Sequence, residues 1–561
     1  MRITNKIMQN NTLTNININK NLQNKLSHQM STQKLLTRPS DDPVVAIRSL
    51  RLRTNVTEVT QFYKKNAPDA QSWLSVTQDA LNTTLDVMTN MRSEFTTGAN
   101  GDLTSSDRAI IMDSLKALRD EVYATGNVDF AGRYIFTGYR TGETLTFTDE
   151  TTQQYSITEQ VTSAALDTIT HVNSADLMNI TAGNVATNTT TQLAVSSGQL
   201  NRLQLSYKEC DDAAPVIEYA PTTGTDGNVT WQSLNTVTLR SFDTITWQQP
   251  RLDGNGDPVL DDSSNPIIDT VTGTAYDFML AAADGSVTSY TDANDNTVDV
   301  ADGIFLKDTG EILLSDNAYT TLSSTKDDLG TEVNEAEIRV TYEKSTWREN
   351  DLRPEHYFAC TTDSNVPAKA IAYNQSYLST GNVERQVIAY DVGYNQTIRV
   401  NTTADEGFDP AVVRVVDDVL QALEDVTKME QSTQTIEKAL EGETDESKRS
   451  QLQTTLDAAQ KAMTYLNDKL QSLFESGITK MQDFINAESI QITEVGTRLS
   501  RLDLVTSRLS GQKTTFETLQ SANEDADITE VAIQLSSANL TYTAALQATA
   551  KIAQTTLLNY L

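Results

Sequence analysis

The 561-residue chain is poor in cysteine, in aromatic residues and in long apolar runs. Cys210 and Cys360 are its two cysteines, and because they show no CxxC spacing they indicate neither a zinc site nor a redox motif. We expect two free thiols rather than a disulfide. No segment reaches the roughly 20 consecutive apolar residues that cross a bilayer. The first residues also lack the apolar core of a cleaved secretory signal, so we expect no such signal.

Basic residues are outnumbered by acidic ones. Lys and Arg total 43, Asp and Glu total 76, and the net charge is −33. Nucleic-acid binding needs clustered Lys and Arg, so this balance argues against it. A large negative charge suits a solvent-exposed protein that repulsion keeps soluble.

Catalytic and metal-binding patterns are missing as well. The three histidines, His28, His171 and His356, are far apart in sequence, and none belongs to an HExxH motif. Residues 253–258 space oxygen ligands like the start of an EF-hand loop, but Pro258 stands where Gly is needed. A hairpin turn explains this segment better. We therefore expect no enzyme, no cofactor and no metal site.

Acidic residues are absent from both ends of this acidic chain. Residues 1–40 contain six Lys and Arg but no Asp or Glu, and residues 531–561 contain a single Lys and no acid. Both ends carry apolar residues at helical spacing, although an exposed terminus is normally solvated. We infer that the ends are buried together, against neighbouring subunits, or both. The predicted assembly-interface residues are Leu22, Leu26, Met30, Val531, Leu535, Tyr542, Ile552, Leu558 and Tyr560.

The period of the apolar pattern changes twice along the chain. Residues 1–140 and 406–561 show helical spacing, and an unbroken alternation of three and four occurs at Leu74, Thr77, Leu81, Thr84, Met88, Met91 and Phe95. Residues 141–405 instead alternate polar and apolar residues between turns, as at 144–148, 237–239 and 338–342. Trp231, Trp247 and Trp347 lie in this zone, and core packing explains them better than a carbohydrate site.

These patterns predict an α+β multidomain protein. Its long N- and C-terminal helices pack as a coiled-coil-like bundle, and a β-rich middle region is inserted between them. We expect a terminal helical core from residues 1–40 and 521–561, and a helical bundle from 41–140 and 406–520. We expect residues 141–405 to form the inserted β-rich region, which is long enough for two subdomains.

A helix–break–helix joint is predicted at Pro39, Ser40, Asp41, Asp42 and Pro43. The proline at 39 disfavours helix at the preceding residue. The second aspartate is a good N-cap, and the proline after it suits the first helical turn. We expect an interdomain joint here.

This joint resembles the flagellin superfamily and, within it, the hook–filament junction proteins. In that family a Leu/Met-Ser-x-Gly segment leads to Pro-Ser-Asp-Asp-Pro; here Met30 and Ser31 match, and Gln33 replaces the usual Gly. Three further segments are similar to family motifs. They are residues 132–141 (GRYIFTGYRT), residues 494–499 (EVGTRL) and residues 539–546 (NLTYTAAL) with the ending 557–561 (LLNYL).

The resemblance implies an extracellular structural protein of the bacterial flagellum without enzymatic activity. The terminal helices would form the inner core of a tube, and the β region would face outward. Export would use the flagellar type III apparatus. The implied partners are hook-associated protein 1, flagellin, further copies of the chain itself in a ring, and a flagellar export chaperone.

Two other functions stay open from the sequence. The chain could be a divergent flagellin that builds the filament, which shares the same helical ends. Alternatively, the β insertion at residues 141–405 could be an adhesive binding module, because its sequence is long and rich in turns. Residues 145–405 match no family motif and exceed the usual length of the middle domain.

Overall fold

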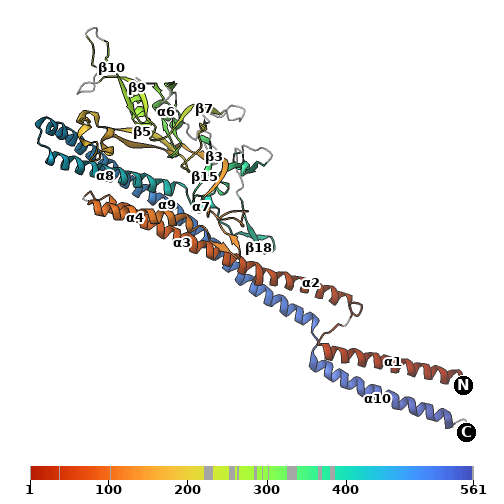
Figure 1. Ribbon diagram of the computed structural model, residues 1–561. Helices are drawn as coiled ribbons and strands as arrows, with labels where there is room; N and C mark the ends of the chain where they lie inside the picture. Colours follow the sequence, from red (N-terminus) through yellow and green to blue (C-terminus); the bar gives the residue numbers. More distant parts are fainter. Residues whose placement is uncertain are drawn as a thin grey trace. The chain divides into compact units, whose positions relative to one another are not determined.

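The computed structural model (Figure 1) forms two compact units. The terminal unit contains residues 1–72, 389–400 and 497–561; the central unit contains residues 73–388 and 401–496. The residues described are 2–36, 38–101, 103–219, 231–251, 259–261, 265–283, 287–292, 295–300, 302–324, 338–363, 369–378 and 386–558. The candidate turn at residues 253–258 lies outside them.

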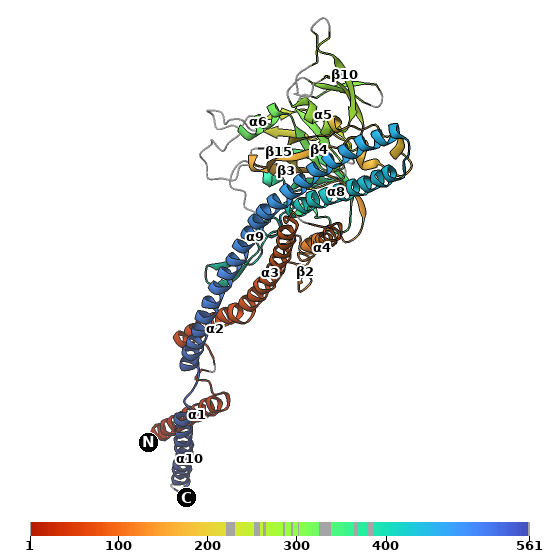
Figure 2. The same cartoon turned by 90° about the vertical axis from the view of Figure 1, so that its left-hand side faces the viewer.

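The terminal unit is mainly helical. Its helix α1 (Arg2–Thr32) lies beside α10 (Ile528–Leu558), as both views show (Figures 1 and 2). Helix α2 (Pro43–Gln61) continues through a π-helical turn (Phe62–Asn66), and the small hairpin of β18 (Ala389–Gly393) and β19 (Gln396–Arg399) packs against that turn. Long helices at both ends of the chain are therefore confirmed.

The helices of the central unit pack through the predicted heptad seam. The long helices are α3 (Ala67–Gly98), α4 (Ser105–Ala124), α8 (Ala411–Gly442) and α9 (Glu446–Glu524), and α3 and α9 continue from one unit into the other in sequence. All seven seam residues of α3 are buried. Phe95 meets Phe474 of α9 edge to face at 6.1 Å. A Cβ added at Gly98 would lie 2.3 Å from the Phe474 ring, so only glycine fits at the end of α3.

The middle of the chain forms β-sheets with short helices, as the change of period predicted. In the described residues a six-stranded sheet has the order β17-β16-β3-β15-β6-β7, a five-stranded sheet the order β4-β5-β14-β13-β8, and a four-stranded sheet the order β10-β9-β11-β12. Neighbouring strands are antiparallel except β13 and β8, which are parallel. The short helices are α5 (Ala275–Ala282), α6 (Asp316–Ser324) and α7 (Ala404–Gly407).

Most strands are short, as expected between frequent turns, whereas β3, β5 and β15 have 11, 9 and 10 residues. Their bounds are β1 (Asp129–Phe130), β2 (Arg133–Tyr134), β3 (Thr151–Val161), β4 (Leu166–Asn173), β5 (Ser196–Gln204), β6 (Val216–Tyr219), β7 (Gln232–Leu234), β8 (Thr236–Leu239), β9 (Ile245–Pro250), β10 (Ile268–Gly273), β11 (Ser289–Thr291), β12 (Thr297–Asp299), β13 (Gly303–Leu306), β14 (Glu311–Leu314), β15 (Ile338–Trp347), β16 (Ala359–Thr362) and β17 (Ile371–Tyr373). The strands expected at 237–239 and 338–342 are thus confirmed within β8 and β15.

The strand expected at residues 144–148 was wrong. Apart from a single bridge, from Thr146 to Leu352, this segment is irregular. The Asn127 side chain accepts hydrogen bonds from the backbone N–H of Leu145 (2.9 Å) and of Thr146 (3.2 Å). Leu145 and Phe147 are buried, and their backbone groups bond residues 350, 351 and 353, so pairing is limited to the surroundings of this one bridge.

One buried arginine ties the five-stranded sheet to the helices of the central unit. Arg202 of β5 is 2% exposed and donates to Asp167 of β4 and to Asp418 of α8, at distances of 2.8–3.1 Å. It also pairs with Glu311 of β14 at 2.5 Å. Lys480 of α9 reaches Asp167 at 3.0 Å. The sheet and the two helices are therefore joined by charge as well as by apolar packing.

The two cysteines and two of the three tryptophans of this region behave as the sequence indicated, whereas Trp231 is only half-buried. Trp247 and Trp347 are buried in sheet cores, and Trp231 lies 3.9 Å below the Arg339 guanidinium. Cys210 and Cys360 are buried free thiols. Among the described helices none combines the length and hydropathy that crossing a bilayer requires.

Candidate assembly surface and joint

Helices α1 and α10 share a narrow buried stripe. Leu26 contacts Val531 and Ala538, and Ala526 and Leu535 pack around them. The side chain of Gln23 also donates to Asn539 Oδ1 at 2.6 Å. One face of each helix is thus covered within the terminal unit.

The predicted interface residues divide between that stripe and the open surface. Leu26 and Val531 are buried, Leu535 and Tyr542 are half-buried, and Leu22 and Met30 are 46% and 41% exposed. Ile552 and Leu558 belong to α10, but their side chains lie outside the described part, as does Tyr560. Whether these residues form an interface between subunits stays a prediction.

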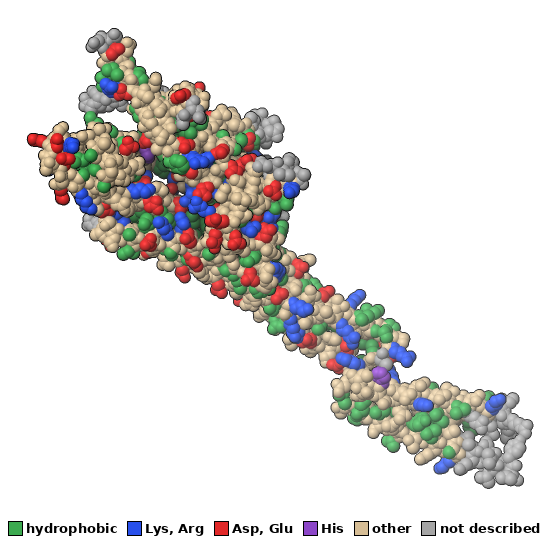
Figure 3. Space-filling model, viewed as in Figure 1, with side chains coloured by type: hydrophobic (Ala, Val, Ile, Leu, Met, Phe, Trp, Pro, Cys, Tyr) green, Lys and Arg blue, Asp and Glu red, His purple; other side chains and the backbone are tan. Residues whose placement is uncertain are grey.

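Sequence reasoning missed other apolar residues that the pair leaves exposed. They occur on both helices and are visible as hydrophobic side chains along the α1–α10 surface (Figure 3). The sequence feature that could have revealed them is the apolar spacing of the acid-free ends. This spacing places apolar residues on more of the helix surface than the buried stripe alone. These residues are Ile7, Met8, Leu13, Ile18, Ile528, Ile533, Leu540 and Leu546.

The local structure of the predicted joint is confirmed. Asp42 is the N-cap of α2, and its carboxylate accepts hydrogen bonds from the backbone N–H of Val44 (3.0 Å) and Val45 (3.1 Å). Pro43 occupies the first turn, where its missing N–H costs nothing. The Asp41 carboxylate accepts from the backbone N–H of Arg38 at 3.0 Å. That the segment is an interdomain joint stays a prediction.

Just before this cap, residues 33–35 meet residues 524–526, and we call this contact the crossing. Gln33 has a φ of +58°, a left-handed conformation that favours glycine. Its carbonyl accepts from the N–H of Ala526 at 3.0 Å, and the Leu35 N–H donates to the Glu524 carbonyl at 2.7 Å. The end of α1 is therefore bonded to the segment between α9 and α10. The left-handed backbone also gives a physical reason for the glycine that the resembling family usually has here.

Glu524 is the centre of the polar contacts at this crossing, and sequence reasoning did not find it. Its side chain is 5% exposed and takes two hydrogen bonds from Arg53, Nε at 2.7 Å and Nη2 at 2.8 Å. Ser49 also donates to it, and Lys34 lies 3.6 Å away. Arg53 is the main cause that lowers the pKa of Glu524 to about 2. Lys34 bonds the next carboxylate, Asp525, at 2.5 Å.

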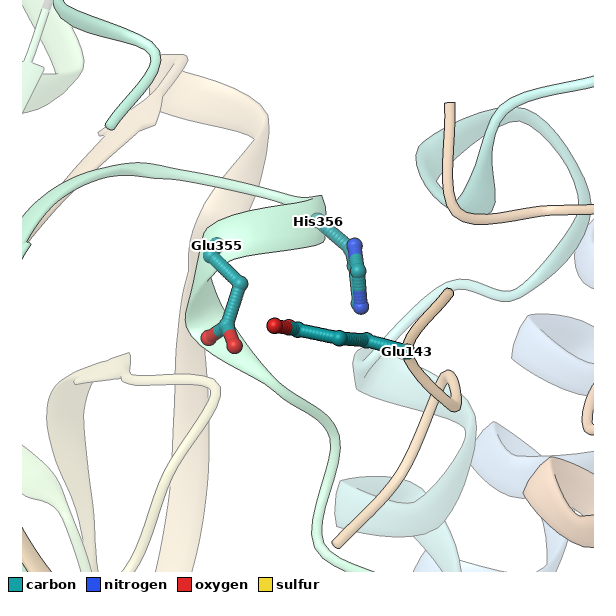
Figure 4. A group of neighbouring side chains, drawn as sticks. All are labelled: Glu143, Glu355 and His356. Atoms are coloured by element: carbon teal, nitrogen blue, oxygen red, sulfur yellow. The ribbon is translucent and has the colours of Figure 1, made fainter. Parts of the chain in front are cut away.

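One group in the described residues has the composition of a metal site. Glu143, Glu355 and His356 lie close together (Figure 4). However, Arg353 Nη1 donates to both carboxylates at 3.2 Å, so a cation already bridges them. His356 Nε2 bonds the Thr144 carbonyl at 3.0 Å, and burial lowers the pKa of His356 to about 4. The group therefore fits an ion-pair cluster better than a metal centre.

The N-terminal part of the chain is similar to a known class of proteins. Residues 3–141 match the family described as the bacterial flagellin N-terminal helical region. This part of the chain is thus similar to the N-terminal helical region of bacterial flagellins. The chain is 29% identical over 143 residues to a flagellin of Clostridium tyrobutyricum, a match that covers 25% of this chain and 38% of that flagellin.

The chain is also similar to one particular flagellar protein. The chain is 31% identical over 191 residues to flagellar hook-associated protein 3 of Salmonella typhimurium, covering 33% of this chain and 59% of that protein. The chain thus spans less than two thirds of that relative's length. A solved structure of a putative flagellar hook-associated protein from Vibrio parahaemolyticus aligns with 86% of this chain and 100% of its own, at 12% identity and a TM-score of 0.31. The resemblance to hook-associated protein 3 that the motifs indicated is confirmed.

Proposed function

We propose that this chain is a structural adaptor of the bacterial flagellum, which joins hook-associated protein 1 on the hook side to the flagellin filament. The observation that carries the proposal is the similarity to flagellar hook-associated protein 3. The proline-flanked Ser-Asp-Asp joint supports it, because flagellins usually have Lys-Asp-Asp-Ala-Ala-Gly at this point. The role is structural and needs no catalytic residue, cofactor or metal.

Assembly would use the apolar surface of the terminal unit. Helices α1 and α10 cover one stripe of each other and leave large apolar side chains exposed on both. Exposed apolar patches mark protein–protein contacts, and copies that meet through different patches form rings or tubes. The proposed partners are further copies in a ring, hook-associated protein 1, flagellin and, before export through the type III apparatus, a flagellar chaperone.

Labelling of the protein on intact flagella tests this function. We expect one site per flagellum, at the base of the filament. Removing residues 531–561 takes away most of α10, so we also expect filaments to detach and be recovered in the medium. A label distributed along the whole filament, or attached filaments after the deletion, would contradict the proposal.

A divergent flagellin is the second candidate, and the match to the Clostridium flagellin favours it. The two functions differ in copy number, because a filament contains far more subunits than a junction ring. Quantitative immunoblotting of sheared filaments separates them, with flagellin as the reference. The adhesive hypothesis depends only on the length and the frequent turns of residues 141–405, so we do not propose it.

A further inference from the structure

The two units carry charge of opposite sign. The terminal unit has 17 Lys and Arg against 11 Asp and Glu, a net charge of +6, so the central unit carries −39. Surfaces of opposite charge attract, and the attraction steers encounters between molecules. A contact between the terminal unit of one copy and the central unit of another is therefore favoured over contacts between like units.

The terminal unit exposes an apolar stripe on α2 beside two arginines. Val44, Ile47 and Leu50 are 66%, 54% and 62% exposed and follow each other at intervals of three. Arg48 and Arg51 are exposed next to them on the same side of the helix, and in the described residues neither forms an ion pair. Figure 3 shows Lys and Arg side chains among hydrophobic ones over α2. We call these five residues the α2 stripe.

The central unit exposes a stripe of the opposite character on α4. Ile110 is 64% exposed, and the acidic Asp113 and Glu121 are exposed on the same outward side of the helix. The basic residues of α4 point the other way, toward α8: Arg108 pairs with Glu430, and Lys116 lies 3.6 Å from Glu424. The outward side is therefore left acidic. We call Ile110, Asp113 and Glu121 the α4 stripe.

We propose that the α2 stripe of one copy docks on the α4 stripe of a second copy. Ile110 meets the apolar residues of the α2 stripe in this contact, and Arg48 and Arg51 face Asp113 and Glu121 beside it. The two stripes differ, so the contact is head-to-tail: each copy uses its α2 stripe on one neighbour and its α4 stripe on the other. Contacts of this kind close into rings or continue as helices. The inference rests on the proposed function for its setting, the junction ring.

Disulfide cross-linking of the full-length chain tests the pairing. One preparation carries Leu50→Cys and a second carries Ile110→Cys. The native thiols Cys210 and Cys360 are buried, so we expect them not to cross-link. The unsubstituted chain is the control. Under mild oxidation we expect a covalent dimer when the two variants are mixed and none from either alone. A chain with both substitutions should give a ladder of oligomers. A dimer from Leu50→Cys alone, or no dimer in the mixture, would overturn the proposal.

A charge swap tests the electrostatic part and controls for folding. Arg48→Glu with Arg51→Glu in the Leu50→Cys chain should lower the dimer yield roughly tenfold at low salt. Adding Asp113→Arg and Glu121→Arg to the Ile110→Cys partner should restore it, which a misfolded α2 variant could not do. If the reversal has no effect, or the swap fails to restore the dimer, the assigned charge pairs are wrong.

Failure of this inference can be told apart from failure of the proposed function. If the label marks the filament base but the mixed variants do not cross-link, the junction role stands and the docking surface is wrong. If the variants cross-link but the label covers the whole filament, the contact stands and belongs to a filament subunit.

Discussion

Arg53 and Glu524 form a two-point ion pair across 471 residues of sequence, with Nε and Nη2 donating to the two carboxylate oxygens at 2.7 and 2.8 Å. The pair joins α2 to the last turn of α9, next to the point where the chain enters α10. Two parallel charge-assisted bonds fix both distance and orientation. The pair therefore fixes α2 against the end of α9 within the terminal unit.

Replacing Glu524 with glutamine should weaken the terminal unit. The amide removes the negative charge that Arg53 and Lys34 face, and we expect a loss of about 1–2 kcal/mol, less than for a fully buried pair because Arg53 is 56% exposed. Hydrogen–deuterium exchange of α1 and α10 would measure it. Glu517→Gln is the matched control, since its pair with Lys513 is an exposed i,i+4 contact worth about 0.3–0.5 kcal/mol. Equal effects would contradict the special role of Glu524.

Replacing Gln33 with glycine should stabilise the same crossing. The residue has a φ of +58°, which costs a residue with a side chain roughly 1–2 kcal/mol, whereas glycine adopts it freely. After the greater flexibility of unfolded glycine is subtracted, we expect a gain of about 0.5–1 kcal/mol. Denaturant unfolding measures it. Gln33→Ala keeps the Cβ and should give no gain; stabilisation by alanine would show that the conformation is not the cause.

Replacing Arg202 with methionine should strongly destabilise the central unit. Asp167, Glu311 and Asp418 would lose their shared cation in a buried site, which costs about 3–5 kcal/mol. Thermal unfolding followed by circular dichroism measures the loss. Arg251→Met removes a solvent-exposed ion pair with Asp269, so it should lower the unfolding temperature far less than Arg202→Met does. Similar losses for both variants would show that the buried contacts of Arg202 with three carboxylates add no particular stability.

Glu488 should make the central unit less stable as the pH rises. This residue of α9 is 2% exposed, and burial raises its pKa to about 8, so the folded state keeps its proton while the unfolded state loses it near pH 4.3. The contribution of the neutral acid is complete below about pH 4.3 and is lost progressively up to pH 8.

Glu488→Met should remove that loss. We expect the variant to gain roughly 1–3 kcal/mol over the parent chain at pH 8 and much less at pH 5. Denaturant unfolding at both values measures the difference. Glu475→Met replaces an exposed glutamate of the same helix and should show no such pH dependence. A gain of equal size at both pH values would mean that packing, rather than ionisation, is responsible.

Local patterns predicted those parts of the fold that depend on neighbours in sequence. The seam of α3 was readable because residues three and four apart share one face of a helix, whatever that face meets. The cap at Asp42 was readable because its partners are the next backbone N–H groups. The strand expected at 144–148 failed because a side chain from outside the segment, Asn127, bonds its backbone.

The sequence by itself determined the helical ends, the β-rich middle, the N-cap of α2 and the resemblance to the flagellin superfamily, because each depends on a local period or a contiguous motif. Only the tertiary structure decided that Glu524 meets Arg53, that Arg202 gathers three carboxylates, and which apolar residues of α1 and α10 stay exposed. These contacts join positions far apart in sequence, and a charged residue looks the same in sequence whether its partner is another residue or water.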